Sequence, residues 1–356
     1  MAVTRSKLRR RPRLGLDGKV VLALASVVLI AMAGSGQVRA EASQIRFVDQ
    51  PGGLLYIPMH VVISQKLIEK RAKEAGLGDV KVSGTTMSGG AAMNDALLSG
   101  NADFLIAGVA PLLKLWDKTK GRSNEVRAMM AVASMPLQYI TNDPRVKTAK
   151  DFVGITDHRI GVPAVKTSMQ AVILEMVAEQ LTGDPFKLNA LTVSMPHPQS
   201  FTAVIGGKSP IRTHGGASEP FSSRLLKAKD KDIRLIFSSY DIVGPHTLVL
   251  LYCTRKWKED NPKLFKIVYD AYMEAFAWAN ADFKRAAQFE KEYSQLTLEV
   301  DEIQAIISDR NRMFYDPVPR STMKFADFLH RTKSIDNKPA SWKDYMWETA
   351  HEFAGN

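Results

Sequence analysis

The chain has 356 residues, of which 45% are hydrophobic and 24% charged, and it carries a formal net charge of +11 at pH 7. Residues 1–40 hold eight Lys or Arg and one Asp, so the remaining 316 residues hold 40 basic and 36 acidic side chains, a net charge of +4. This balance is too weak to indicate nucleic-acid binding. The single cysteine, Cys253, excludes an internal disulfide and a Cys-based metal cluster, and its apolar neighbours predict a buried, unreactive thiol.

The N-terminus has the layout of a secretory signal peptide. Basic residues between positions 5 and 13 precede a mostly apolar run at 20–33, and Val38-Arg39-Ala40 supplies an acceptable cleavage site. The run of fourteen residues is shorter than the roughly 20 that a membrane-spanning helix needs. We therefore predict a signal peptide at 1–40, cleavage after Ala40 and export to the periplasm, with the Sec and twin-arginine routes both open.

The remaining length exceeds one compact core, so two domains are expected. Short apolar strand signals alternate with helical periods, which is typical of parallel α/β sheets. In chain order the first half is expected to form a strand at 45–48, a helix at 58–75, a strand at 80–83, a helix at 90–98, a strand at 104–107, a helix at 111–118 and a strand at 126–133.

The second half repeats this alternation before it turns helical. The segment 137–141 is expected to leave the first lobe and 247–253 to return to it; Asn261 and Pro262 suit the cap and first position of a helix. We place lobe I at 41–137 and 245–356 and lobe II at 138–244. The other expected elements are strands at 159–162, 191–194 and 233–237, helices at 168–181 and 201–205, and helices covering lobe I near 299–309, 323–330 and 342–350.

Short motifs follow one another along the whole predicted mature chain. The longest is Ser88 to Phe104, continued by Ile106 to Leu113. The others, in order, are Tyr56-Ile57-Pro58, Gly161-Val162-Pro163, Glu219-Pro220-Phe221, Asn261-Pro262 and Ala275 to Asn280. In this order and spacing they resemble the solute-binding proteins of nitrate/sulfonate/taurine-type ABC importers. The resemblance implies a type II periplasmic-binding-protein fold, two α/β lobes around a ligand cleft with C-terminal helices, working with a membrane permease and its ATPase.

Two turns of lobe I are candidate anion sites. Ser88-Gly89-Gly90 stands between a strand and a helix, where backbone amides and the helix dipole can face an anion, although Ser88 would serve equally as an ordinary N-cap. Gly108 and Val109 occupy the next such turn, at the carboxyl end of a strand, where open α/β sheets bind ligands. Gln50 and Tyr56 complete the ligand-binding residues expected from this lobe.

Lobe II offers the preferred anion site. Lys166-Thr167-Ser168 precedes a helix and combines one charge, two hydroxyls and amide donors; the alternative is a solvated lysine beside an N-cap serine. His214 lies where the resembling family often carries a histidine at the cleft edge, although a lone histidine is more often structural. Gly215-Gly216 replaces a larger side chain of that family, so a roomier pocket is expected. Lys66 stands where the family tends to have glycine, which places the local loop geometry in doubt.

The expected function is ligand capture by lobe closure and delivery to the permease. No nucleophile elbow, zinc-protease motif, P-loop or Cys/His metal spacing occurs in the sequence, so we expect no enzyme, no catalytic residue, no metal and no cofactor. The ligand is expected to be a small, sulfonate-like or other organic anion, and the protein a monomer. A periplasmic ligand sensor stays open as an alternative. A thiamine-pyrimidine-pathway protein is disfavoured because that branch carries a cysteine-rich segment.

Overall fold

The computed structural model describes residues 40–51, 53–88, 90–228 and 232–356. The chain divides into two units, Met1–Ala40 and Glu41–Asn356, and the second is described below. The signal peptide expected at 1–40 lies almost wholly outside the described residues. None of the described helices is both long enough and apolar enough to span a bilayer.

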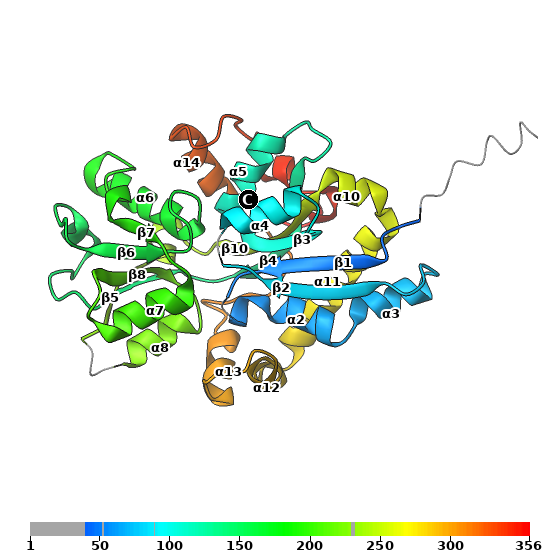
Figure 1. Ribbon diagram of the computed structural model, residues 1–356, viewed down its shortest axis with the longest axis horizontal. Coiled ribbons are helices and arrows are strands. Elements are labelled where there is room, and N and C mark those ends of the chain that lie inside the picture. Colours follow the sequence, from blue (N-terminus) through cyan, green and yellow to red (C-terminus); the bar gives the residue numbers. More distant parts are fainter. Residues whose placement is uncertain (1–39, 52, 89, 229–231) are drawn as a thin grey trace, which may run out of the picture. The chain divides into compact units, whose positions relative to one another are not determined.

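The first five-stranded sheet has the order β2-β1-β3-β10-β4 (Figure 1). Strands β2, β1 and β3 run parallel, whereas β10 lies antiparallel between β3 and β4. The chain therefore leaves this sheet after β4 and returns to it only at β10. The strands are β1 (Gln44–Asp49), β2 (Lys81–Thr86), β3 (Phe104–Gly108), β4 (Val126–Ser134) and β10 (Thr247–Thr254).

The second five-stranded sheet has the order β7-β6-β8-β5-β9 and is formed wholly by the segment between β4 and β10. Its strands are β5 (Gln138–Thr141), β6 (Arg159–Val162), β7 (Thr192–Ser194), β8 (Ile211–Ala217) and β9 (Arg234–Ser238). We call the first sheet with its helices lobe I and the second sheet with its helices lobe II, which is green in Figure 1. The two α/β lobes confirm the predicted fold class.

Helices cover both sheets. Lobe I carries η1 (Gly53–Tyr56), α2 (Ile57–Ser64), α3 (Leu67–Glu74), α4 (Gly90–Leu98) and α5 (Val109–Thr119), and lobe II carries η2 (Ala149–Phe152), α6 (Met169–Thr182), η3 (Asn189–Leu191), α7 (His197–Gly206), α8 (Phe221–Lys227) and α9 (Ser239–Val243). The C-terminal part forms α10 (Arg255–Asp260), α11 (Pro262–Ala281), α12 (Phe283–Tyr293), α13 (Val300–Ser308), α14 (Thr322–Arg331), η5 (Trp342–Tyr345) and η6 (Glu348–Ala350). In Figure 1, α12 and α13 lie together on one side of the view and α14 on the other.

Several details differ from the sequence prediction. The helix expected at 58–75 is broken into α2 and α3 because Lys66 adopts a left-handed conformation, with φ of 53°, at the position where the resembling family tends to have glycine. The helix expected at 342–350 is a pair of short 3₁₀ turns. Strand β8 and helix α8 were not predicted. Cys253 is buried, as predicted, and burial raises the pKa of its thiol.

The start of α11 is capped differently from the prediction. Asn261 makes no side-chain cap; its Oδ1 accepts instead from the amide of Ala42 at 2.7 Å. The carboxylate of Glu41 accepts from the amides of Lys263 and Leu264, at 3.0 and 2.7 Å. A negative charge at a helix N-terminus is stabilising. The residue that follows the predicted cleavage site therefore ties the N-terminal strand to α11.

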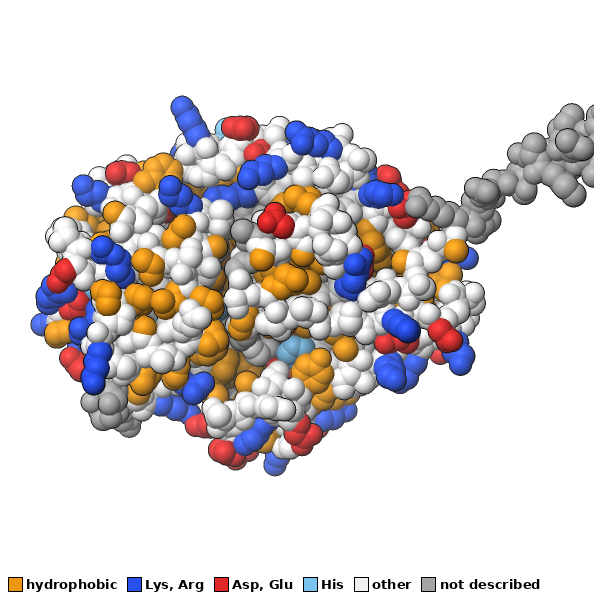
Figure 2. All heavy atoms as spheres, viewed as in Figure 1, with side chains coloured by type: hydrophobic (Ala, Val, Ile, Leu, Met, Phe, Trp, Pro, Cys, Tyr) orange, Lys and Arg blue, Asp and Glu red, His pale blue; other side chains and the backbone are white. Residues whose placement is uncertain are grey.

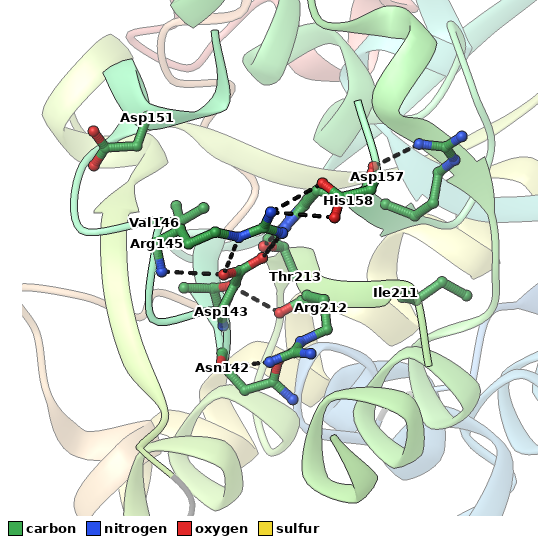
Figure 3. Close-up of polar contacts among 12 residues, drawn as sticks. Asn142, Asp143, Arg145, Val146, Asp151, Asp157, His158, Ile211, Arg212 and Thr213 are labelled. Atoms are coloured by element: carbon green, nitrogen blue, oxygen red, sulfur yellow. Dashed lines mark hydrogen bonds and ion pairs between the residues drawn. The ribbon is translucent and has the colours of Figure 1, made fainter. Parts of the chain in front are cut away.

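A buried polar cluster holds one end of the lobe II sheet together (Figure 3). Asp143, which follows β5, accepts from the guanidinium of Arg145 at 2.8 Å and lies 3.0 Å from Nδ1 of His158. The other ring nitrogen of His158 lies 2.9 Å from the hydroxyl of Thr213 in β8. Hydrogen bonds from Arg145 hold the pKa of Asp143 well below its usual range. The cluster joins the ends of β5, β6 and β8.

Asp143→Ala should lower the free energy of unfolding by about 2–3 kcal/mol, because it removes charge-assisted hydrogen bonds and leaves a buried histidine nitrogen without a partner. Asp157 binds the same arginine from an exposed position, so Asp157→Ala should cost less than about 1 kcal/mol. The depressed pKa of Asp143 contributes stability that is fully present above the unfolded value of about 4 and is lost progressively as pH falls from there toward the lower folded value. Urea unfolding at pH 7 and pH 3 checks both points; equal losses for the two variants would contradict the assignment.

Candidate functional site

The carboxyl end of β1 opens into the cleft between the lobes, where Gln50 contacts three adjoining cavities. The central cavity has a volume of about 30 Å³ and is lined from both lobes. On one side of it the Asp49 compartment, of about 380 Å³, is lined by Asp49, Tyr56 and His60; on the other the Lys114 compartment, of about 280 Å³, is lined by Lys114 and Thr167. Figure 2 shows the hollow between the lobes on one face.

The central cavity collects several of the predicted ligand-binding residues. Gln50, Tyr56 and Gly108 line it from lobe I, and Ser168 from lobe II. Gln170 and His197, which were not predicted, also line it. Its volume matches roughly one molecule of liquid water, so an organic ligand can enter only if the lobes separate or side chains move.

Met169 fills the place expected for an anion at α5. Gly108 caps this helix, and the amide of Ala110 donates to the thioether sulfur of Met169 at 3.1 Å. A Cβ at Gly108 would lie only 2.5 Å from Met169 Cγ, so the glycine admits this side chain. Val109 is buried and does not line the central cavity. A thioether is a weak acceptor, so a charged ligand group could replace it.

The structure separates the three residues that were predicted to form the lobe II anion site. Ser168 caps α6, accepting from the amide of Ala171 at 3.2 Å, and also lines the central cavity. Thr167 lines the Lys114 compartment. Lys166 has a left-handed backbone, and its side chain lines none of the three cavities; its carbonyl accepts from the ammonium of Lys114. Besides the exposed Lys118, the lysine that lines the cleft is therefore the half-buried Lys114, also on α5. Burial lowers its pKa, while Glu175 acts in the opposite direction.

His214 lies behind the cavity wall. Its Nε2 is 2.7 Å from Nδ1 of His197, and it is His197 that lines the central cavity. Burial lowers the pKa of both rings, that of His197 to about 4, so the pair is neutral at pH 7. A direct ligand contact by His214 would require this pair to separate. The structure also shows no extra space at Gly216, where a roomier pocket was expected, because Gln170 packs against this glycine.

The remaining predicted residues belong to the loop before α4. Ser88 is exposed and lines none of the three cavities, and Gly89 lies outside the described residues. Gly90 lines the Lys114 compartment. The part of this motif that faces the cleft is thus the start of α4.

The Asp49 compartment contains a charged cluster that sequence reasoning missed. His60 Nδ1 lies 2.8 Å from Oε2 of Glu290, which is fully buried, and His60 Nε2 lies 3.8 Å from Oδ2 of Asp49. Burial alone would lower the pKa of His60, but the two carboxylates together raise it to about 9. Glu290 and His60 are 230 residues apart in the chain, so no local motif signals their contact.

The two α/β lobes are joined where the chain passes from the first sheet to the second and back, and a cleft lies at the carboxyl end of β1. These features define the type II periplasmic-binding-protein fold. Solved structures share it. The chain is similar to the periplasmic aliphatic sulphonate binding protein SsuA from Escherichia coli, with a TM-score of 0.62 and 18% identity over 86% of this chain and 93% of that one.

Two further structures show the same likeness. The alkanesulfonate-binding protein SsuA from Xanthomonas axonopodis pv. citri, bound to MOPS, has a TM-score of 0.64 and 16% identity over 86% of this chain and 99% of that one. The periplasmic nitrate-binding protein NrtA from Synechocystis PCC 6803 has a TM-score of 0.65 and 14% identity over 88% and 86%. No family model and no curated protein sequence matches the chain. At these identities the likeness establishes the fold.

Proposed function

We propose that this chain is the exported solute-binding component of an ABC importer. The observation that carries the proposal is the cleft itself: cavities lined from both lobes meet at Gln50, in a fold shared with periplasmic proteins that are described as binding sulphonates and nitrate. The signal peptide at 1–40 would deliver the chain to the periplasm. Lobe I would comprise 41–137 and 245–356, lobe II 138–244, and the protein would act as a monomer without catalytic chemistry.

Capture of the solute would proceed by closure of the lobes about the two crossings between the sheets. Ion pairs between lobe II and the C-terminal part already join the two sides. Arg312, between α13 and α14, lies 3.2 Å from Glu219 of lobe II, and Arg331 of α14 donates to Glu179 of α6 at 2.9 Å. A ligand that contacts both lobes favours the closed form, and this form presents the surface that a permease would recognise.

An acidic group of the solute would occupy the Lys114 compartment. Lys114 supplies a half-buried cation, Thr167 a hydroxyl, and Gly90 the start of a helix. A helix N-terminus and a lysine both favour negative charge. The proposed ligand is still an organic anion, as expected from the sequence, but Lys114 replaces Lys166 as the side chain that would bind its charge.

The proposal predicts that protein purified from the periplasm releases a small acid on denaturation, detectable by mass spectrometry. Adding the identified compound back at a hundred times its Kd should stabilise the protein by about 2.7 kcal/mol, measured as a higher melting temperature. Lys114→Gln should weaken binding of this acid by roughly tenfold or more, whereas Lys166→Gln should change it little. If no compound is released and no small acid raises the melting temperature, the solute-binding proposal fails.

A further inference from the structure

Met169 joins the two lobes where they meet in the cleft. It is the first residue of α6 in lobe II and is 2% exposed. Its thioether sulfur accepts at 3.1 Å from the amide of Ala110, which lies in the first turn of α5 in lobe I. Met169, Gly108 and Pro111 all line the central cavity, so this contact between the lobes lies at the cavity itself.

Sulfur is an unusual acceptor for this amide. The first amides of an α-helix have no acceptor within the helix, and an oxygen atom of a side chain, water or ligand normally supplies one. Among the described residues, no side-chain hydrogen bond caps α5 at its N-cap, Gly108. The thioether of Met169, a weak acceptor, approaches the amide of Ala110 from the other lobe. A negatively charged oxygen would bind the same amide more strongly.

A second contact links the same two elements. The ammonium of Lys114, later in α5, donates to the carbonyl of Lys166 in the turn that leads into α6. Lys114 also lines the compartment in which the proposed function places the acidic group of the solute. An acidic group there would compete with the Lys166 carbonyl for the ammonium. Both contacts between α5 and the start of α6 therefore use neutral acceptors that an anion can replace.

The side chain of Met169 can leave its place without unfolding α6. Methionine is unbranched and has three rotatable side-chain bonds. Other residues fix the start of the helix: Ser168 caps it by accepting from the amide of Ala171. The hydroxyl of Tyr139 donates to the carbonyl of Gln170. Displacement of the thioether therefore requires rotation of one side chain, while the backbone of α6 stays in place.

We infer that Met169 is a built-in competitor of the solute, whose thioether holds the amide of Ala110 and joins the lobes until an oxygen acceptor of the solute displaces it. The inference rests on the proposed solute-binding function and adds a residue that sets its affinity and selectivity. A solute gains from the exchange only if its acceptor is stronger than a thioether. Met169 thus disfavours apolar compounds, and its contact with Ala110 opposes separation of the lobes.

The first test measures lobe separation in the full mature chain, freed of solute by unfolding and refolding. Ser123→Cys in lobe I and Lys187→Cys in lobe II replace exposed residues and can carry spin labels, since the native Cys253 is buried. Met169→Ala should increase the mean distance between the labels, measured by pulsed electron paramagnetic resonance. Met176→Ala is the matched control and should leave the distance unchanged, because Met176 is a buried methionine of the same helix that lines none of the three cavities.

The second test measures affinity by calorimetry, with methanesulfonate and acetate as probes. Met169→Ala and Met169→Leu should both bind these anions roughly three- to tenfold more tightly than wild type, because each removes the sulfur that competes for the amide of Ala110. Leucine keeps most of the apolar bulk, so Met169→Leu guards against a folding defect in the alanine variant. Met176→Ala should change the affinity by less than about twofold.

The direction of the change in affinity decides the inference. Weaker binding by both Met169 variants would show that this residue holds the solute and does not compete with it. Unchanged affinity in both variants would also overturn the inference, while binding by the wild type would leave the solute-binding function intact. If neither probe and no released compound binds wild type or variants, the function fails and the inference with it; a wider lobe separation in Met169→Ala would then mark only a contact between the lobes.

Discussion

Glu290→Ala should lower the free energy of unfolding by about 3–5 kcal/mol, the range for breaking a buried ion pair by removing one partner. Glu290 on α12 is fully buried and holds His60 of α2 at 2.8 Å, and its second oxygen accepts from the hydroxyl of Ser294 at 2.5 Å. Without it, a buried imidazolium would keep only the more distant Asp49. The effect should appear in urea unfolding at pH 6.5.

The same variant should alter the pH dependence of stability. His60 has a pKa of about 9 in the fold and about 6.5 in the unfolded chain. A raised pKa contributes stability that is fully present below the unfolded value and is lost as pH rises through the folded value. The difference in unfolding free energy between wild type and Glu290→Ala should therefore narrow between about pH 6.5 and pH 9.5.

Glu292→Ala is the control for this prediction. Glu292 lies on the same helix and is exposed, and among the described residues its side chain hydrogen-bonds to Gln288 alone, one turn away. Its removal should cost less than about 0.5 kcal/mol at any pH in this range. If Glu290→Ala were equally mild, or if its effect grew with rising pH, the buried pair would not carry the stability assigned to it.

The alternation of strand and helix signals was sufficient to predict most of the fold. Strands β1, β3 and β4 are short apolar runs and α4 has a regular apolar face, so their positions agree with the sequence to within one or two residues. Strand β8 was missed because Gly215 and Gly216 interrupt its apolar pattern, and glycine is unfavourable in isolated strands. The break at Lys66 depends on a left-handed conformation that a lysine side chain does not signal.

The site was harder to predict than the fold. Turns after strands are recognisable in sequence, and for this reason Gly108 and Ser168 were found in the central cavity. Lys114 was missed because it lies in the interior of α5, where a lysine normally faces solvent. Glu290 meets His60 through the packing of α12 against α2, which joins segments far apart in the chain. Residues that depend on such long-range packing carry no local pattern.

Gly216 connects a departure from the resembling family with the shape of the cleft. It lies in β8 with φ of 71°, and a Cβ at this position would lie 2.5 Å from Cγ and 3.1 Å from Cβ of Gln170. Gln170 in turn lines the central cavity and lies 3.3 Å from His197. The glycine therefore permits both an unusual backbone conformation and the close approach of α6 to β8.

Gly216→Ala should lower the free energy of unfolding by about 2–5 kcal/mol, the sum of about 1–2 for a left-handed alanine and about 1–3 for overpacking. Gly183→Ala separates the two contributions, because Gly183 has φ of 77° and nothing within 4 Å of an added Cβ; it should cost only about 1–2 kcal/mol. Gly216→Ala should also weaken solute binding, since Gln170, which lines the cavity, must shift to admit the added Cβ. Thermal unfolding and calorimetry on both variants check this, and equal losses of stability with unchanged affinity would show that the contact between Gly216 and Gln170 does not shape the site.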